Sequence, residues 1–173
     1  MKYEHLTEQT CFNLLKEYGT DQRVIAHCKA VAQVALRMAE QLNSCGLKID
    51  VNAIYAAALL HDIARSEKNH AKAGAKWLSD RGYPHIAELV VEHMQLGEQE
   101  GGQINEKMVV YIADKLVSEA REVSIHERFL GRMKRCGADA LQEVMIRYLQ
   151  TLGIYRLITK TIQEGGKHIE EAV

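Results

Sequence analysis

Residues 56–64 read Ala-Ala-Ala-Leu-Leu-His-Asp-Ile-Ala, an apolar run that places His61 beside Asp62. We expect this run to be helical and to end in the polar segment that starts at Arg65. Neutral imidazole and carboxylate are both competent metal ligands, and burying either without a partner is costly. The pair alone fits a hydrogen-bonded core histidine followed by a loop aspartate equally well. Three other stretches favour a metal site.

Composition limits the class of protein before these stretches are considered. The chain has 173 residues, of which 47% are apolar and 26% charged, as in a soluble globular protein. We expect one domain over residues 1–173, in the cytoplasm, because no apolar stretch resembles a signal core or a membrane span. The net charge of -1 and the lack of a basic block argue against a nucleic acid polymer or a membrane as partner.

A single proline and long patterns with a 3.6-residue period predict an all-α protein, a compact helical bundle. The expected helices cover about residues 7–15, 21–43, 51–64, 69–82, 84–93 and 105–120, with two or three more in 124–168, broken near Gly137 and Gly153. The glycine-rich stretch 96–102 is expected either to cover the site or to be a mobile surface connection.

Polar residues interrupt the apolar faces of these helices. His27 lies three residues after Val24 and four before Val31, so it points inward with them. His93 and Asp114 interrupt apolar faces in the same way. Four helices that each present an inward histidine or aspartate are best explained by a shared cation. Such mixed nitrogen and oxygen ligands suit iron, manganese, nickel, cobalt, zinc or magnesium.

The order of these residues resembles the HD-domain superfamily of metal-dependent phosphohydrolases. Its pattern of a histidine, a His-Asp pair and a distant aspartate falls on His27, His61-Asp62 and Asp114. Two-metal subgroups add two histidines, which His70 and His93 resemble. The likeness covers roughly residues 20–122, so the helices in 124–168 are expected to pack on this core.

Within the superfamily, the chain is most similar to the HDIG-type subgroup, near the symmetrical dinucleoside-tetraphosphate hydrolases. That branch follows its last aspartate with an arginine, as Arg121 does here. Ala64 stands where the subgroup has glycine, which predicts that the helix continues a little further. The differing spacings around the motif put the dinucleotide substrate in doubt.

The resemblance implies a phosphohydrolase that acts on a nucleotide or other small phosphate ester through a metal-bound hydroxide, with His61 and Asp62 catalytic. One or two divalent ions are implied. The expected metal ligands are His27, His61, Asp62, His70, His93 and Asp114. Asp62 would bridge two metals, the first held by His27, His61 and Asp114 and the second by His70 and His93. The alternative is one metal, with His93 as a nearby acid or phosphate contact.

Cations near these ligands are candidates for binding the substrate phosphate. They are Lys72, Arg121, Arg23 and Lys115, each of which is also a reasonable solvated surface residue. A homodimer is an expected oligomeric state. Two other functions stay open: a nucleotide-sensing or regulatory module without turnover, and an iron-dependent oxygenase that uses the same ligands.

Overall fold

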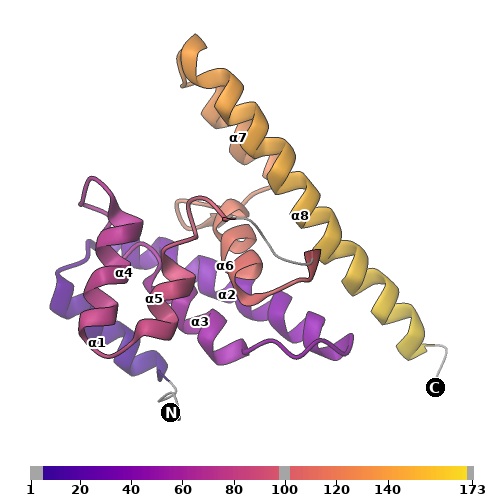
Figure 1. Ribbon diagram of the computed structural model, residues 1–173, viewed down its shortest axis with the longest axis horizontal. Helices are drawn as coiled ribbons and strands as arrows, with labels where there is room; N and C mark the ends of the chain where they lie inside the picture. Colours follow the sequence, from indigo (N-terminus) through magenta and orange to yellow (C-terminus); the bar gives the residue numbers. More distant parts are fainter. Residues whose placement is uncertain (1–5, 98–101, 171–173) are drawn as a thin grey trace.

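A computed structural model describes residues 6–97 and 102–170, with side chains described up to residue 165. The helices are α1 (Glu8–Tyr18), α2 (Gln22–Ser44), α3 (Val51–Leu60), α4 (His70–Asp80), α5 (Pro84–Val90), α6 (Glu106–Lys115), α7 (Ile125–Met133) and α8 (Ala138–Glu170). Two short antiparallel strands, β1 (Val117–Ser118) and β2 (Arg121–Glu122), lie between α6 and α7. The described chain is therefore all-α apart from this small hairpin (Figure 1).

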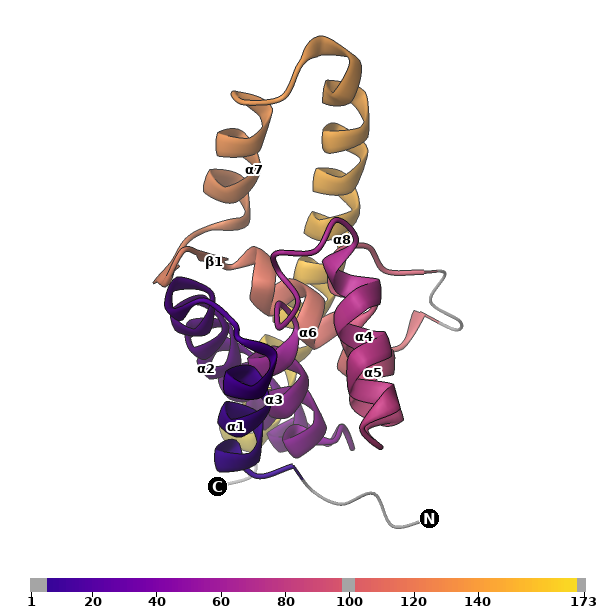
Figure 2. The same cartoon turned by 90° about the vertical axis from the view of Figure 1, so that its left-hand side faces the viewer.

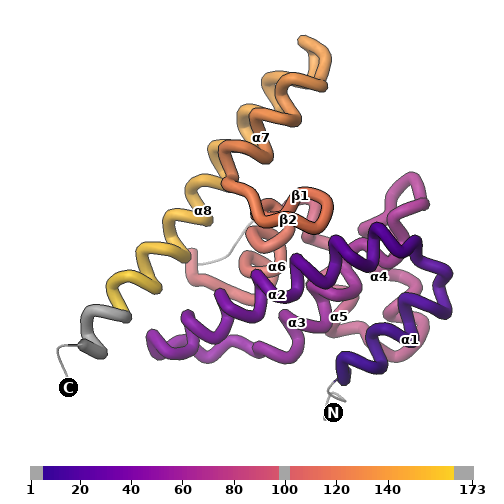
Figure 3. Tube along the Cα trace, turned by 180° about the vertical axis from the view of Figure 1, so that it is seen from behind, coloured from indigo at the N-terminus to yellow at the C-terminus, as the bar shows by residue number. Residues whose placement is uncertain are grey.

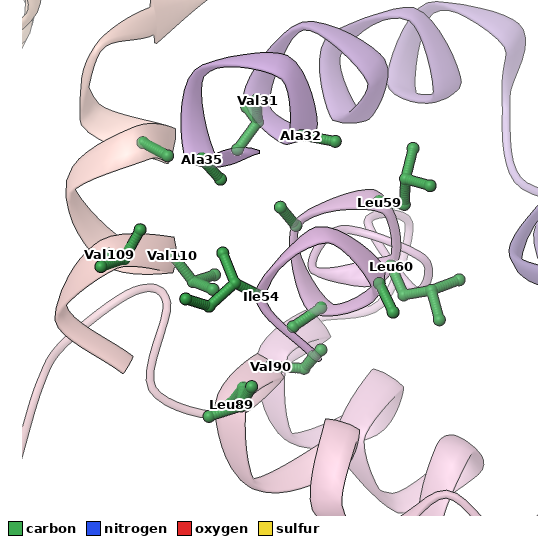
Figure 4. Close-up of a cluster of buried hydrophobic side chains, with 14 of the residues drawn as sticks. Val31, Ala32, Ala35, Ile54, Leu59, Leu60, Leu89, Val90, Val109 and Val110 are labelled. Atoms are coloured by element: carbon green, nitrogen blue, oxygen red, sulfur yellow. The ribbon is translucent and has the colours of Figure 1, made fainter. Parts of the chain in front are cut away.

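Helix α3 forms the centre of the bundle. It packs against α1, α2, α5 and α6, and from Ala56 to Leu60 every side chain is buried. Its alanines let neighbouring helices approach closely, while Ile54 and Leu59 fill the space between them (Figure 4). The His-Asp pair follows directly after this helix, so the most buried element of the fold carries the candidate ligands inward.

The helices α7 and α8 form a hairpin that projects from the body made by α1 to α6 (Figure 2). The hairpin has its own small apolar cluster around Ile125, Phe129 and Val144. The C-terminal half of α8 returns to the main core, where Ile158 is fully buried. Seen from behind, β1 and β2 lie between α2 and the base of this hairpin (Figure 3).

The predicted helix starts agree with the structure at several caps. The side chains of Thr7, Asp21, Asp50 and Asn105 each accept a hydrogen bond from the first turn of the helix that follows. Gly19 adopts a left-handed conformation after α1, as expected for a residue that ends a helix.

Three predicted helix ends are wrong. Helix α3 ends at Leu60 instead of continuing to about Ala64, because 61–67 forms successive tight turns with hydrogen bonds between residues three apart. Helix α5 ends at Val90, so His93 lies in a turn after it. Helix α6 ends at Lys115, where the chain turns into β1 instead of running to 120.

The predicted break near Gly137 is confirmed, but the one near Gly153 is wrong. Helix α8 is continuous through Gly153 for 33 residues. One glycine inside a helix costs only about 1 kcal/mol, which packing of the surrounding residues offsets. None of the helices in the described chain is both long and apolar enough to span a lipid bilayer.

Candidate metal centre

Five different segments of the bundle bring the candidate ligands together. His27 lies on α2, the His61-Asp62 pair in the turn after α3, and His70 at the first residue of α4. His93 lies in the turn after α5, and Asp114 near the end of α6. The structure thus brings all six predicted metal ligands to one place.

The first group consists of His27, His61 and Asp114. The Oδ1 atom of Asp114 lies 3.2 Å from Nε2 of His27 and 3.6 Å from Nε2 of His61. The ligand atoms of these three residues lie within 4.8 Å of one another, close enough to hold one ion.

The second group surrounds Asp62. Its Oδ1 atom lies 3.1 Å from Nε2 of His70 and 3.4 Å from Nε2 of His93, and these two nitrogens are 3.3 Å apart. The other carboxylate oxygen, Oδ2, lies 3.7 Å from Nε2 of His61 in the first group. Asp62 therefore presents one oxygen to each group, as a bridging ligand would.

Backbone carbonyls orient three of the four imidazoles. Nδ1 of His27 lies 2.6 Å from the Glu119 oxygen, and Nδ1 of His61 lies 2.8 Å from the Ala58 oxygen. Nδ1 of His93 lies 2.7 Å from the oxygen of Val90. A carbonyl oxygen can only accept a hydrogen bond, so each Nδ1 carries a proton and each Nε2, when it is not protonated, presents its lone pair to the cluster.

The arrangement of the donor atoms fits a bound cation. Nε2 of His61 and Oδ1 of Asp62 are buried atoms without a hydrogen-bond partner in the described chain. Both are electron-pair donors that face other electron-pair donors, an arrangement that is repulsive without a positive charge between them. Imidazole nitrogens with carboxylate oxygens form a set that suits a divalent transition metal.

Electrostatics keep both aspartates ionised. Burial opposes their charged forms, but the surrounding groups outweigh it. His61 is the largest of the influences that hold the pKa of Asp62 below its ordinary range. Lys115, followed by a hydrogen bond with His27, holds the pKa of Asp114 well below its ordinary value. Both carboxylates are therefore ready to bind a cation at neutral pH.

The pKa values of the two buried histidines, His61 and His93, shift in opposite directions. Burial lowers the pKa of His93, which keeps that imidazole neutral and able to bind a metal. Burial also opposes the charged form of His61, but Cys28 and the Asp114 carboxylate raise its pKa above the ordinary value. Metal binding at His61 would accordingly displace a proton.

Lys115 and Arg128 both lie beside the Asp114 carboxylate. The buried Lys115 ammonium donates to Oδ2 of Asp114 at 2.6 Å and to the His93 backbone oxygen at 2.9 Å. Lys115 therefore links the two ligand groups. Nη2 of Arg128 lies 3.7 Å from Oδ1 of Asp114.

Four of the six candidate ligands line a cleft of about 1200 Å³: His27, Asp62, His93 and Asp114. Of the four predicted phosphate-binding residues, Arg23 and Lys115 line it. Lys72 and Arg121 are exposed and do not belong to the described cleft lining, and Arg121 pairs with Glu127 at 2.6 Å. Part of the predicted cover, residues 98–101 of the stretch 96–102, lies outside the described residues.

Sequence reasoning missed most of the arginines in this cleft. Six arginines line it: Arg23, Arg65, Arg128, Arg132, Arg135 and Arg147. Three of them recur at intervals of four and three residues, the spacing of one helical face. That spacing was the signal in the sequence that could have identified them.

Fold and site together define an all-α protein whose clustered histidines and aspartates could hold a metal ion. A family model described as HD domain matches residues 24–119, and the chain belongs to this family. HD domains bind divalent metals and are usually metal-dependent phosphohydrolases. The match does not identify the branch of symmetrical dinucleoside-tetraphosphate hydrolases.

The chain is similar to two proteins named as tRNA methyltransferases and to one uncharacterized protein. A tRNA (cytidine(56)-2'-O)-methyltransferase of Thermoplasma volcanium is 27% identical over 84% of this chain, and one of Picrophilus torridus is 33% identical over 69%. This chain spans only 47% and 39% of those two proteins. An uncharacterized protein of Methanocaldococcus jannaschii is 28% identical over 68% of this chain and 80% of its own length. No solved structure matches the chain.

The names of the two methyltransferases bear on the expected partners. Proteins so named act on an RNA polymer, so the expectation that this chain has no nucleic acid partner is not supported. The expectation rested on net charge, which does not describe how charge is distributed over the surface.

Proposed function

We propose that the protein is a metal-dependent phosphohydrolase that acts on a nucleotide or other phosphate ester. The observation that carries this proposal is the pair of buried donor atoms without partners, Nε2 of His61 and Oδ1 of Asp62, at the base of an arginine-lined cleft. A metal site open to a positively charged cleft suits a reaction at a phosphoryl group.

The proposed ligand roles follow the two groups. His27, His61 and Asp114 would hold one ion, while His70 and His93 would hold a second. Asp62 would contact both, because its two oxygens face different groups. A divalent metal at such a site lowers the pKa of bound water and polarises a phosphoryl oxygen.

Protein side chains supply the remaining parts of the reaction. The carbonyls that bind Nδ1 of the histidines hold each Nε2 in place before substrate arrives. Arg128, beside Asp114, is placed to bind the phosphate nearest the ligands. Lys115 holds Asp114 in position. Its ammonium group also contacts the His93 carbonyl oxygen and the Tyr111 ring, so it is already engaged by the protein and we do not assign it to the substrate.

Hydrolysis by purified protein loaded with Mn²⁺, followed by chromatographic separation of the products, tests the activity. The screen includes nucleoside mono-, di- and triphosphates, a dinucleoside tetraphosphate and RNA oligonucleotides, and it runs with and without oxygen. Hydrolysis that does not need oxygen is the expected result. Oxygen consumption would favour an oxygenase, and unchanged nucleotide recovered from metal-loaded protein would favour a sensing module.

Metal stoichiometry tests the ligand roles separately from activity. Wild-type protein is expected to hold two ions, and His70→Ala and His93→Ala are each expected to lower that number. A fully loaded wild type with one ion, unchanged in both variants, would contradict the two-metal assignment.

The names of the methyltransferase relatives make an RNA phosphate a second candidate substrate. Their matched part is less than half of each protein, so the named activity is not transferred to this chain. The arginines of the cleft favour including RNA, because arginine is well suited to bind phosphate.

A further inference from the structure

A row of arginines leads from the metal ligands toward the tip of the α7–α8 hairpin. Arg128 and Arg132 lie one turn apart on α7, and Arg135 follows in the turn after that helix. All three line the same cleft. At 1.5 Å per residue, the row spans roughly 10 Å, beginning beside Asp114.

Part of this row has no counter-ion. Within the described chain, Arg132 and Arg135 make neither an ion pair nor a hydrogen bond through their guanidinium groups. Glu127 also lines the cleft, but Arg121 already binds it. Arg132 and Arg135 are both exposed, so their guanidinium groups can contact an anionic ligand that enters the cleft from solvent.

The cleft has room for a ligand larger than a mononucleotide. Its volume of about 1200 Å³ exceeds the ~300–1,000 Å³ typical of small-molecule pockets. A row of roughly 10 Å is long enough to contact more than one backbone phosphate of a single strand. A compact phosphate ester bound at the metal ligands would leave the distant arginines without a partner.

The aromatic residues of the cleft offer little surface for stacking bases. Tyr111 and Phe129 line it but are only 5% and 4% exposed. Recognition in the cleft would therefore depend on phosphates rather than on base identity.

We propose that Arg128, Arg132 and Arg135 bind successive phosphates of a single-stranded oligonucleotide, with one phosphate at the metal ligands. This inference rests on the proposed function, because it names the substrate of the same cleft. It assigns Arg132 and Arg135 as the residues that favour a strand over a mononucleotide.

The test measures binding to metal-loaded protein of a fluorescein-labelled single-stranded RNA of about 12 nucleotides. Phosphorothioate linkages slow cleavage while keeping the backbone charge. The Arg132→Gln/Arg135→Gln protein is compared with Lys134→Gln/Arg156→Gln, which removes two exposed charges outside the described cleft lining. Polarisation is recorded over a series of salt concentrations.

The cleft variant is expected to weaken binding roughly tenfold or more, and to reduce the salt slope by about 0.7 for each lost contact. The control is expected to keep a slope close to wild type. Equal effects in the two variants would overturn the proposal. Displacement of the strand by an equal concentration of adenosine triphosphate would also overturn it, because a compact ligand would then suffice.

Unlabelled oligonucleotide and inorganic polyphosphate both carry a row of negative charges, so the two are compared as competitors of the labelled strand. If the oligonucleotide displaces the labelled strand at a lower phosphate concentration than polyphosphate does, the proposal is supported. If polyphosphate displaces it at the lower concentration, the proposal is overturned. Binding is read without turnover. Strand binding that depends on these arginines, in a protein without phosphatase activity, would reject only the proposed function.

Discussion

Asp62 connects the two groups of the candidate metal centre. One of its oxygens faces His70 and His93, and the other faces His61. Because it is the residue shared by both groups, its charge is expected to matter more than that of any single histidine.

Asp62→Asn keeps the volume of the side chain but removes its charge. Turnover is expected to fall about a thousandfold or more, because the amide cannot replace an anionic ligand. Metal content should fall with it, while far-ultraviolet circular dichroism stays like wild type. Asp80→Asn, at an exposed residue of α4, is the matched control. A folded Asp62→Asn protein with near wild-type turnover would contradict this role.

Cys11 provides a prediction about pH that does not involve the metal centre. Burial raises the pKa of the Cys11 thiol from 9.0 to about 12. Between these values the unfolded chain loses the proton and the folded chain keeps it. The contribution of this thiol to stability is therefore complete below about pH 9 and declines toward pH 12, by at most about 1.4 kcal/mol per pH unit.

Urea unfolding at several pH values checks this expectation. The decline in unfolding free energy above about pH 9 should be smaller in Cys11→Ala than in wild type. Identical slopes in the two proteins would contradict the assignment. The comparison of slopes removes the contributions of tyrosines and lysines, which both proteins share.

At the scale of elements, the close approach of α4 to the turn after α3 positions His70. A Cβ atom at Gly74 would lie 3.0 Å from Cγ2 of Ile63 and 3.6 Å from Cβ of Ala64. Glycine therefore allows α4 to pack directly on the residues that follow the His-Asp pair.

Gly74→Val is expected to push α4 outward and to lower the unfolding free energy by about 1–3 kcal/mol. The displaced His70 should weaken the second ion more than the first. Denaturant unfolding and metal titration measure the two effects. Ser79→Val introduces the same side chain at an exposed position of α4 and should do neither. Unchanged metal binding in Gly74→Val would show that His70 does not depend on this contact.

The small β1–β2 hairpin has a similar positioning role. Glu119, between its strands, adopts a positive φ of 57° and directs its carbonyl oxygen to Nδ1 of His27. A two-residue strand pair is too short to stabilise itself, so its place depends on contacts with α2 and α6.

At the scale of the whole molecule, the candidate ligands bring together five segments of the bundle. A metal that binds the folded chain alone therefore stabilises the entire bundle. At a free concentration about 100 times its Kd, Mn²⁺ should contribute about 2.7 kcal/mol and raise Tm by roughly 5–11 °C.

Thermal unfolding with Mn²⁺ and with a chelator measures this shift. Asp62→Asn is expected to show a much smaller difference between the two conditions, because it lacks the shared ligand. Equal Tm values for wild type with metal and with chelator would contradict the assignment of these residues as metal ligands.

The sequence by itself determined the helical class and predicted the candidate ligands that the fold brings together. Local patterns carry that information: apolar residues at 3.6-residue spacing predict helices, and side chains such as Asp21 and Asp50 identify where they begin. The ordered histidines and aspartates identified the family, which the HD-domain match over residues 24–119 confirms. These features depend on neighbours close in the chain.

Only the tertiary structure decided how the cleft is charged and where several helices end. The end of α3 at Leu60 and the hairpin after Lys115 depend on packing between distant segments. The net charge of -1 gave no indication that six arginines line one cleft. Electrostatic potential depends on distances in space, and folding places α7 beside Asp114, so the arginines meet the metal ligands only in the folded molecule.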